Sequence, residues 1–384
     1  MKICFWLGSI ATEGGVQRVT SVIANKLAEH HEVVVLTSDT AEQMLHKNYV
    51  LDNSITWIPM TKEVFKFNIL FHILRKGLSM VSSGKTLSNE QLYFPIHIRK
   101  NLIQFFNKQD FDVIIGVHWY YSLLLAMISP ELNAKTIGWH HNSFDAYFNT
   151  SNRYAWGKKP LFHKYIAQLD EYVVLNEKIK EKIDATFGID STVIYNPKSF
   201  ESNDKVDVSK KVFLAAGRMV YAKGFDTLIE AFKIFVEKNQ DWQLLLVGDG
   251  EDLSKLKEKI RKYGLENRIM TPGKTDNIQQ YYLQSSVLLL SSRWEGMPMI
   301  VLEALEMGCP VVAFDIDAMQ PLVTDGVEGL IVKEKQDPEK YAQAMLKIAE
   351  NQGLRASMQQ AALKKAELFT IDRIGEEWEK VLRK

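Results

Sequence analysis

Short apolar runs alternate along the chain with segments whose apolar residues recur at helical spacing. The run at residues 2–7 predicts a buried strand, and residues 16–29 predict the helix that follows it. Further strands are expected at residues 32–37, 54–59, 112–117, 135–140, 171–176 and 192–197. Strands that alternate with helices are typical of a doubly wound parallel sheet, so the first half of the chain is expected to have an α/β fold.

A second series of the same kind begins after residue 211. Its expected elements are strands within residues 212–217, 242–250, 267–273, 287–292, 310–315 and 329–332, and a helix at 226–238. The joint between the two series, near residues 196–207, is rich in Ser, Asn, Asp and Lys, which suits a linker.

The expected organisation is therefore two Rossmann-like domains, at residues 1–196 and 197–365, followed by a C-terminal helix within 366–384. Each domain is expected to be a doubly wound parallel sheet of the α/β class. Open sheets of this kind bind ligands outside the carboxyl ends of their strands, so two of them facing a central cleft would share one active site.

Composition excludes several classes of protein. The 384 residues hold 47 Lys and Arg against 47 Asp and Glu, and this zero net charge gives no reason to expect nucleic-acid binding. The two cysteines, Cys4 and Cys309, lie in or beside apolar strand-like runs, so no disulfide framework is expected and a cytoplasmic location fits. No apolar run reaches 18 residues, and the N-terminal run is typical of a first strand, not of a signal peptide.

Two carboxylates bracket the segment EGMPMIVLE, which carries the most chemical information in the chain. Glu295 is expected in a loop after a buried strand, and Glu303 about one turn inside a helix that begins near Pro298. Both can then face a ligand at the carboxyl end of the sheet, where a carboxylate accepts two hydrogen bonds from a sugar diol. Backbone N–H groups at the helix start can bind an anion. The alternative, two solvated charges on an amphipathic helix, is disfavoured by Gly296, Pro298 and the strand that follows.

This segment closely resembles the donor-site signature of glycosyltransferase family four, the retaining glycosyltransferases of GT-B fold. The matching residues are Glu295, Gly296, Met297, Pro298, Glu303, Ala304, Gly308, Pro310, Val311 and Val312. The resemblance covers essentially the full length and is strongest over residues 190–333. It implies a nucleotide-sugar donor bound by the C-terminal domain, with Glu303 on the ribose hydroxyls and Glu295 on those of the transferred sugar. It also implies that the C-terminal helix crosses back to the first domain.

Two cations follow the first strand of the second series. Arg218 offers a planar fork and Lys223 a point charge, which together suit a diphosphate. With Gly217 and Gly224 they match the family motif G-R-x4-K-G. The resemblance implies that these cations, and not a metal, stabilise the leaving nucleoside diphosphate.

Glycines at two other strand ends are candidates for contact with the donor. Gly14 and Gly15 form a loop where backbone can approach a phosphate closely, and the family has such a pair near the donor diphosphate. Gly248 begins the turn GDGE, for which a donor contact and a plain turn both stay open. The strict G-x-G-x-x-G fingerprint is absent, which argues against a dinucleotide dehydrogenase.

Two adjacent histidines, His140 and His141, follow a strand and precede Asn142. A histidine at such a strand end can use its neutral ring or its backbone carbonyl near a reacting sugar. The family has one histidine here, and its common His-Asn ending favours His141. Both remain candidates, with a packed or surface role for the other.

Two D-x-D triplets, at residues 110–112 and 315–317, could suggest a metal site. In a different glycosyltransferase fold such a triplet holds a divalent cation on a diphosphate. Capping of a strand edge or a turn is favoured here, so no metal is expected, and no cofactor besides the donor substrate.

Residues 62–108 hold eight Lys or Arg against two acids, Glu63 and Glu90, with seven Phe and Tyr between them. A basic, aromatic, partly helical stretch is typical of contact with an anionic membrane surface. The alternative is a core helix with solvated cations. The resembling family often acts on lipid-linked acceptors at the inner leaflet, which favours peripheral contact at the inner face of the cytoplasmic membrane.

The sequence thus predicts a retaining, metal-independent glycosyltransferase. The expected donor is a UDP-sugar carrying a hexose or N-acetylhexosamine, and the expected acceptor is a surface polysaccharide, lipopolysaccharide or lipid-linked glycan. Pro298 within EGMP resembles the enzymes of polysaccharide and lipopolysaccharide synthesis. Two alternatives stay open: a nucleotide-sugar 2-epimerase of GT-B fold, and a non-catalytic sugar-binding protein that would not need both Arg218 and Lys223.

Overall fold

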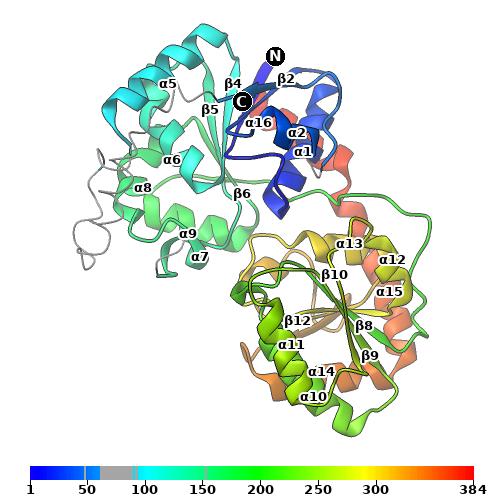
Figure 1. The fold of residues 1–384 in the computed structure, drawn as a ribbon. Helices are drawn as coiled ribbons and strands as arrows, with labels where there is room; N and C mark the ends of the chain where they lie inside the picture. The colour runs from blue at the N-terminus through cyan, green and yellow to red at the C-terminus, as the bar shows by residue number, and fades with distance from the viewer. Residues whose placement is uncertain (47–48, 61–89, 91–93, 152–153) are drawn as a thin grey trace. The chain divides into compact units, whose positions relative to one another are not determined.

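The computed structural model describes residues 1–46, 49–60, 90, 94–151 and 154–384, and Figure 1 shows its fold. The chain divides into two compact units. Unit 1 comprises Met1–Asn196 and Ile371–Lys384, and unit 2 comprises Pro197–Thr370. The returning segment starts later than residue 366 because α15 (Gln352–Ala366) and the short turn after it belong to unit 2.

Unit 1 is built on a parallel sheet with seven strands among its described residues, in the order β3-β2-β1-β4-β5-β6-β7. The strands are β1 (Lys2–Trp6), β2 (Glu32–Thr37), β3 (Thr56–Pro59), β4 (Val113–Val117), β5 (Lys135–Trp139), β6 (Glu171–Val174) and β7 (Thr192–Val193). The central strands are short runs of branched aliphatic and aromatic residues, buried as expected of a sheet covered on both faces.

Helices flank this sheet, and several of their ends follow from local sequence. They are α1 (Gly15–Ala28), α2 (Ala41–Leu45), α5 (Ile96–Gln109), α6 (His118–Ile128), α7 (Phe144–Phe148), α8 (Lys159–Tyr165) and α9 (Glu177–Phe187). The Asn176 side chain caps the N-terminus of α9 by accepting from the Ile179 N–H, and Gly188 ends that helix in a left-handed conformation.

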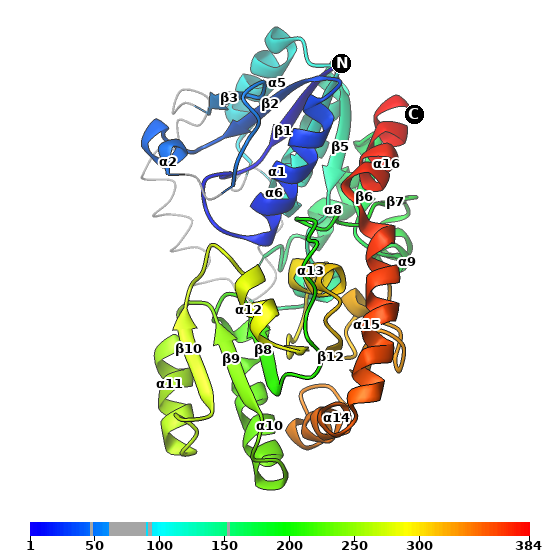
Figure 2. The same ribbon diagram turned by 90° about the vertical axis from the view of Figure 1, so that its right-hand side faces the viewer.

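The C-terminal helix α16 (Ile371–Arg383) completes unit 1 by packing beside α1 (Figure 2). A Cβ added at Gly375 would lie 2.9 Å from Cγ of Lys26, so the absence of a side chain allows the two helices to approach closely. Trp378 is fully buried, with its ring centroid 4.7 Å from that of Trp139 on β5. The helix is therefore part of the core of unit 1 despite its distance along the sequence.

Unit 2 repeats the architecture with a parallel sheet in the order β10-β9-β8-β11-β12-β13. Its strands are β8 (Val212–Ala216), β9 (Gln243–Val247), β10 (Ile269–Gly273), β11 (Val287–Leu290), β12 (Val311–Phe314) and β13 (Gly329–Val332). Its helices are α10 (Phe225–Lys238), α11 (Leu253–Lys262), α12 (Gln279–Gln284), α13 (Met299–Met307), α14 (Pro338–Glu350) and α15. Figure 2 shows β10, β9 and β8 side by side in this unit.

Both sheets reverse their strand order at one point, between β1 and β4 in unit 1 and between β8 and β11 in unit 2. The loops after these strands diverge to opposite sides, and open α/β sheets bind ligands in the crevice this leaves. The expected α/β class, with two doubly wound parallel sheets, is confirmed.

Candidate functional site

The loop after β8 lies against the turn after β9 at a contact that only glycine permits. Gly248 has φ 140°, and a Cβ there would lie 2.0 Å from the carbonyl oxygen of Gly217. The Met219 N–H donates to the Asp249 carbonyl at 2.7 Å, and the Gly217 N–H to that of Val247 at 3.0 Å. The turn therefore fixes the backbone from which Arg218 extends.

The loops after β8 and β11 meet at the switch point of unit 2 and bring Lys223 and Glu295 together. The ammonium of Lys223 lies 2.5 Å from Oε1 of Glu295, and the Ser292 hydroxyl donates to the same oxygen at 2.7 Å. Gly224 allows this approach, since a Cβ there would lie 2.2 Å from the Ser291 carbonyl oxygen. Both charged side chains are partly enclosed, with 23% and 14% of their surface exposed. A cation and a carboxylate thus stand side by side where a doubly wound sheet binds its ligand.

Arg218 is in the same loop as Lys223 but is exposed. Its guanidinium is available to an anionic group at this edge of the sheet. Gly296 and the nearly buried Met297 form the turn that leads into α13.

Helix α13 begins after Pro298 and ends at Gly308, which adopts a left-handed conformation. Glu303 lies just over one turn into the helix, as the sequence predicted, and is only 2% exposed. Its Oε1 accepts a hydrogen bond from the Ser199 hydroxyl at 2.8 Å. Glu303 is therefore held by the segment that enters unit 2.

Arg293 is a structural residue of this site that the sequence pattern did not identify as one. It forms a bidentate ion pair with Asp226 in the first turn of α10, at 2.9 and 2.8 Å, and its guanidinium carbon lies 4.0 Å from the centroid of the Tyr221 ring. Burial alone would raise the pKa of Asp226, but the Arg293 guanidinium outweighs it and holds that pKa below its usual range. Asp226 lies three residues after Lys223 in the sequence. An acidic residue so close to the predicted site was the one sequence feature that could have suggested an ion-pair partner for Arg293.

The loop after β1 in unit 1 is held by hydrogen bonds between its backbone and the side chains of Tyr49 and Asp39, and Gly14 and Gly15 lie at its end. Gly14 precedes the first residue of α1, and its N–H and carbonyl both bond to the Tyr49 hydroxyl at 3.2 Å. Earlier in the loop, Asp39 accepts from the backbone N–H of Ile10 at 2.7 Å. The two glycines thus sit at a fixed helix N-terminus beside the switch point of unit 1.

The two candidate histidines at the end of β5 differ in exposure. His140 is fully buried, with Nδ1 3.0 Å from the Tyr172 hydroxyl, whereas His141 is partly exposed and packs its ring on Trp139 at 4.3 Å. Within the described residues, Nε2 of each ring is buried without a hydrogen-bond partner. Burial lowers the pKa of His140 to about 3, and lowers that of His141 well below its usual value. Both rings are therefore neutral at pH 7.

A third histidine, His118, joins this cluster and was missed by the sequence analysis. It opens α6 with φ 74°, an unusual backbone conformation for a residue other than glycine. Its ring lies 5.2 Å from that of Tyr147, which also packs on His140 at 4.4 Å. Burial lowers the pKa of His118 to about 4.

The D-x-D triplets take part in local structure. Asp110 ends α5 in a left-handed conformation, and Asp112 accepts from the Lys2 N–H at 2.6 Å. Asp317 begins a short 3-10 turn after β12. In the part of the chain that the structure describes, no group of three or more His, Cys, Asp or Glu could hold a metal ion.

Most of the basic stretch at 62–108 lies outside the described residues, and only residue 90 and residues 94–108 can be placed. There, Ile98, Leu102 and Phe106 form the buried face of α5. Arg99 pairs with Glu90 at 2.9 Å, whereas Lys100 and Lys108 are exposed. Among the described residues, no helix has the length and apolar character to cross a membrane.

Solved structures of other proteins have the same fold. A variant of S. aureus TarM in complex with Fondaparinux, alpha-GlcNAc-glycerol and UDP superimposes with a TM-score of 0.78, at 17% identity and covering 100% of both chains. Anabaena HepE in complex with UDP-glucose gives a TM-score of 0.76, at 19% identity and covering 100% of this chain and 99% of that one. The fold is GT-B, that of a large class of glycosyltransferases.

Sequence comparison narrows the class to a family. Residues 198–365 match the family described as Glycosyl transferases group 1, and residues 13–198 match Glycosyltransferase Family 4. The amylovoran biosynthesis glycosyltransferase AmsD of Erwinia amylovora is 27% identical over 392 residues, covering 99% of each chain. The chain belongs to the family-four, or group 1, glycosyltransferases, and the expected resemblance to this family is confirmed.

Proposed function

We propose that this glycosyltransferase moves a hexose or N-acetylhexosamine from a UDP-sugar to a hydroxyl group of a surface polysaccharide, lipopolysaccharide or lipid-linked glycan, with retention at the anomeric carbon. The observation that carries the proposal is the contact between Lys223 and Glu295 at the switch point of unit 2. A nucleotide-sugar carries sugar hydroxyls next to a negatively charged diphosphate. The Glu295 carboxylate can accept hydrogen bonds from the hydroxyls, and the neighbouring Lys223 ammonium can bind the diphosphate.

The named relatives support the choice of substrates. TarM is solved with UDP and HepE with UDP-glucose, and AmsD is a glycosyltransferase of amylovoran biosynthesis. Each of these properties belongs to the relative. The same substrate classes are proposed for this chain because it shares the fold and the family.

In the proposed reaction, Arg218 and Lys223 hold the diphosphate, with Gly14, Gly15 and Gly248 near it. Glu303 accepts from the ribose hydroxyls and Glu295 from those of the transferred sugar. Lys223 can serve both Glu295 and a phosphate because an ammonium has three donors.

Attack on the front face of the sugar forms the bond between C1 and the acceptor oxygen as the bond from C1 to the diphosphate oxygen breaks. The acceptor proton passes to the leaving diphosphate, and its negative charge is stabilised by the two cations without a metal. His141 or His140 lines the reacting face.

Substituting the cations tests this account of leaving-group stabilisation. Arg218→Ala and Lys223→Ala should each lower turnover by about 100-fold or more, as expected when a preorganised charge partner is removed. EDTA should leave the wild-type rate unchanged. Activity that disappears with EDTA and returns with Mn²⁺ would contradict metal independence and return attention to the D-x-D triplets.

A nucleotide-sugar panel read by thermal shift tests the donor, because a ligand that binds the folded state raises the midpoint of unfolding. UDP-sugars should stabilise the protein, and UDP should be released from them only when a glycan acceptor is present. Turnover of a UDP-sugar to its 2-epimer without an acceptor would favour the epimerase. Binding without any turnover would favour a sugar-binding protein.

A further inference from the structure

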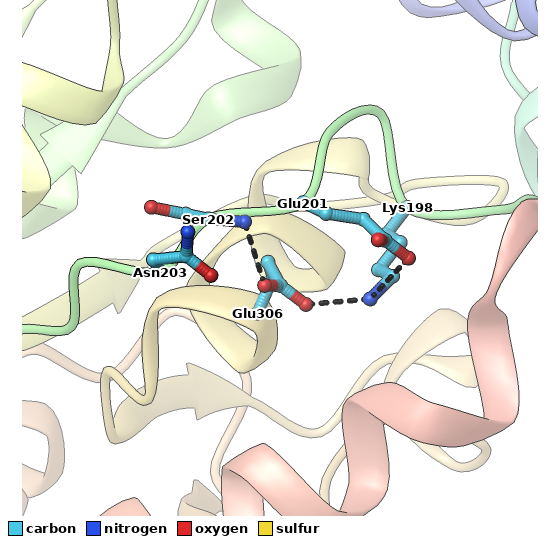
Figure 3. A pocket seen from close by; sticks show the side chains of 5 residues that line it. All are labelled: Lys198, Glu201, Ser202, Asn203 and Glu306. Carbon is cyan, nitrogen blue, oxygen red and sulfur yellow. Dashed lines mark hydrogen bonds and ion pairs between the residues drawn. The ribbon is translucent and has the colours of Figure 1, made fainter.

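Glu306 lies one turn after Glu303 on α13. Its carboxylate bonds to several polar groups of residues 198–205, at the start of unit 2. Its Oε2 lies 2.7 Å from the ammonium of Lys198, and its Oε1 lies 2.9 Å from that of Lys205. The backbone N–H of Ser202 also donates to Oε1, at 2.9 Å. Figure 3 shows Glu306 reaching both Ser202 and Lys198 from the helix below them.

These contacts are largely shielded from water. The side chains of Glu306 and Lys198 are 8% and 10% exposed. Burial raises the pKa of the Glu306 carboxyl, but hydrogen bonds from Lys198 and Lys205 outweigh it and hold that pKa below its usual range. A carboxylate so enclosed persists only with its partners in place, so the segment and the helix are fastened to each other.

Backbone hydrogen bonds hold both ends of this segment. The Val206 N–H donates to the Met307 carbonyl at the end of α13, at 2.9 Å, and the Lys198 N–H donates to the Phe369 carbonyl in the turn after α15, at 2.8 Å. The ammonium of Lys205 also donates to the Glu306 carbonyl, at 2.7 Å. Residues 198–206 are therefore laid along the end of α13 in a fixed register.

This register determines which residue of the segment bonds to Glu303. Ser199 follows Lys198, and its hydroxyl donates to Oε1 of Glu303 at 2.8 Å. The two carboxylates are three residues apart on one helix face. Lys198, one of the partners of Glu306, and Ser199, which donates to Glu303, are adjacent in the segment. Contact of Lys198 with Glu306 thus brings Ser199 to Glu303.

We propose that Glu306 is a positioning residue for donor binding, which acts by holding residues 198–205 on α13 so that Ser199 fixes the orientation of the Glu303 carboxylate. The inference rests on the proposed role of Glu303 in binding the donor ribose. A glutamate side chain has three rotatable bonds, and fixing it before the ligand arrives lowers the conformational entropy lost on binding. The group recognised is the ribose of a nucleoside diphosphate.

The test measures UDP affinity of the full chain by calorimetry at a temperature well below unfolding. Glu306→Gln and Ser199→Ala should each weaken UDP binding about threefold to tenfold, the range expected for a coupled contact. Glu201→Gln is the matched control: Glu201 also pairs with Lys198, at 3.2 Å, but is 72% exposed, and its loss should leave affinity within about twofold. Glutamine has the size and shape of glutamate, so Glu306→Gln removes the charge without crowding its neighbours.

A double-mutant cycle separates positioning from general stability. With Glu303→Gln already present, Glu306→Gln should cause no further loss of UDP affinity, since the carboxylate it positions is gone. Equal losses in both backgrounds would overturn the inference, as would wild-type affinity in both Glu306→Gln and Ser199→Ala. Ser199→Ala leaves the ion pairs of Glu306 intact and so remains informative where Glu306→Gln lowers the unfolding temperature.

Different results would refute the ribose role of Glu303 and the positioning role of Glu306. Wild-type affinity in Glu303→Gln would refute the ribose role, and with it the inference. A clear loss in Glu303→Gln, together with unchanged affinity in the two positioning variants, would refute the inference alone and leave the proposed function standing.

Discussion

Glu303 combines near-complete burial with a single charge, an arrangement that proteins tolerate where a specific partner compensates for lost water. Replacing it by glutamine keeps the shape and removes the charge. Glu303→Gln should weaken UDP binding by about tenfold or more, because a charge-assisted hydrogen bond contributes about 1.5–3 kcal/mol. The unfolding temperature should change by only a few degrees, since Ser199 can still donate to the amide oxygen. UDP affinity within about twofold of the wild type would count against the ribose role.

The histidines at the end of β5 differ in the surface they offer to a substrate. His140 is fully enclosed and bonded to Tyr172, whereas His141 keeps part of its surface exposed. His141→Ala should therefore lower turnover by about 100-fold, in the range for a residue that acts directly on the reacting group, and more than His140→Ala does. The unfolding temperature should show the opposite ranking, because His140 fills the core. Near-normal turnover in both variants would remove histidine from the mechanism.

For single residues, the sequence indicated which ones are candidates for the site but not which of them lie in contact. Glu295 and Lys223 were each recognisable from motif spacing, but their 2.5 Å contact depends on β8 and β11 becoming neighbours, which no local pattern encodes. The alternation of side chains along a strand indicated that only one of His140 and His141 would point outward. His118 escaped notice because its unusual backbone conformation leaves no mark in the sequence.

Arg293 joins two elements, since it ties the loop after β11 to the first turn of α10 and to Tyr221 beside Lys223. Arg293→Ala should leave the loop that carries Arg218 and Lys223 less ordered and lower turnover about tenfold, with a smaller effect on the unfolding temperature. Arg293→Lys should not restore activity, because an ammonium can neither bond Asp226 through two donors nor stack as a planar group on Tyr221.

Lys211→Ala provides the matched control for Arg293. It removes an ion pair with Asp241 whose side chains are 57% and 69% exposed, and it should leave turnover unchanged. Full rescue of Arg293→Ala by lysine would show that charge alone matters at this position.

The helices and strands were predicted with small errors in their ends, because the spacing of apolar residues within each one indicates its type. The strand expected at 287–292 ends at Leu290, and the helix expected at 16–29 spans Gly15–Ala28. The segment at 196–207 was expected to be a linker on composition alone. Its attachment to α13 was not predicted, because Lys198 and Glu306 are more than a hundred residues apart and ion pairs have no periodicity.

The predicted membrane attachment concerns the whole molecule. The chain has no net charge, and residues 62–108 carry a local excess of positive charge. The protein should bind anionic vesicles through residues 62–108 and release them as salt rises, because the attraction is screened over about 8–10 Å at physiological ionic strength. Changing Arg75, Lys76 and Lys100 to Gln should abolish flotation with the vesicles and leave UDP binding intact. Arg99 is kept because it pairs with Glu90.

The matched control for attachment changes Lys255, Lys257 and Lys262 of α11 to Gln, which removes the same charge from an exposed face of unit 2. Flotation should survive this change. Equal binding to neutral and anionic vesicles would show that the stretch is merely solvated, and the acceptor could then be a soluble glycan.

The return of α16 to unit 1 bears on the order in which the protein is made. Unit 2 is continuous in sequence and is inserted between two parts of unit 1, so the ribosome completes it before Ile371 is translated. Until then the place that Trp378 fills beside Trp139 stays empty, and unit 1 cannot bury the apolar surface there. Unit 1 is therefore begun before unit 2 and completed after it.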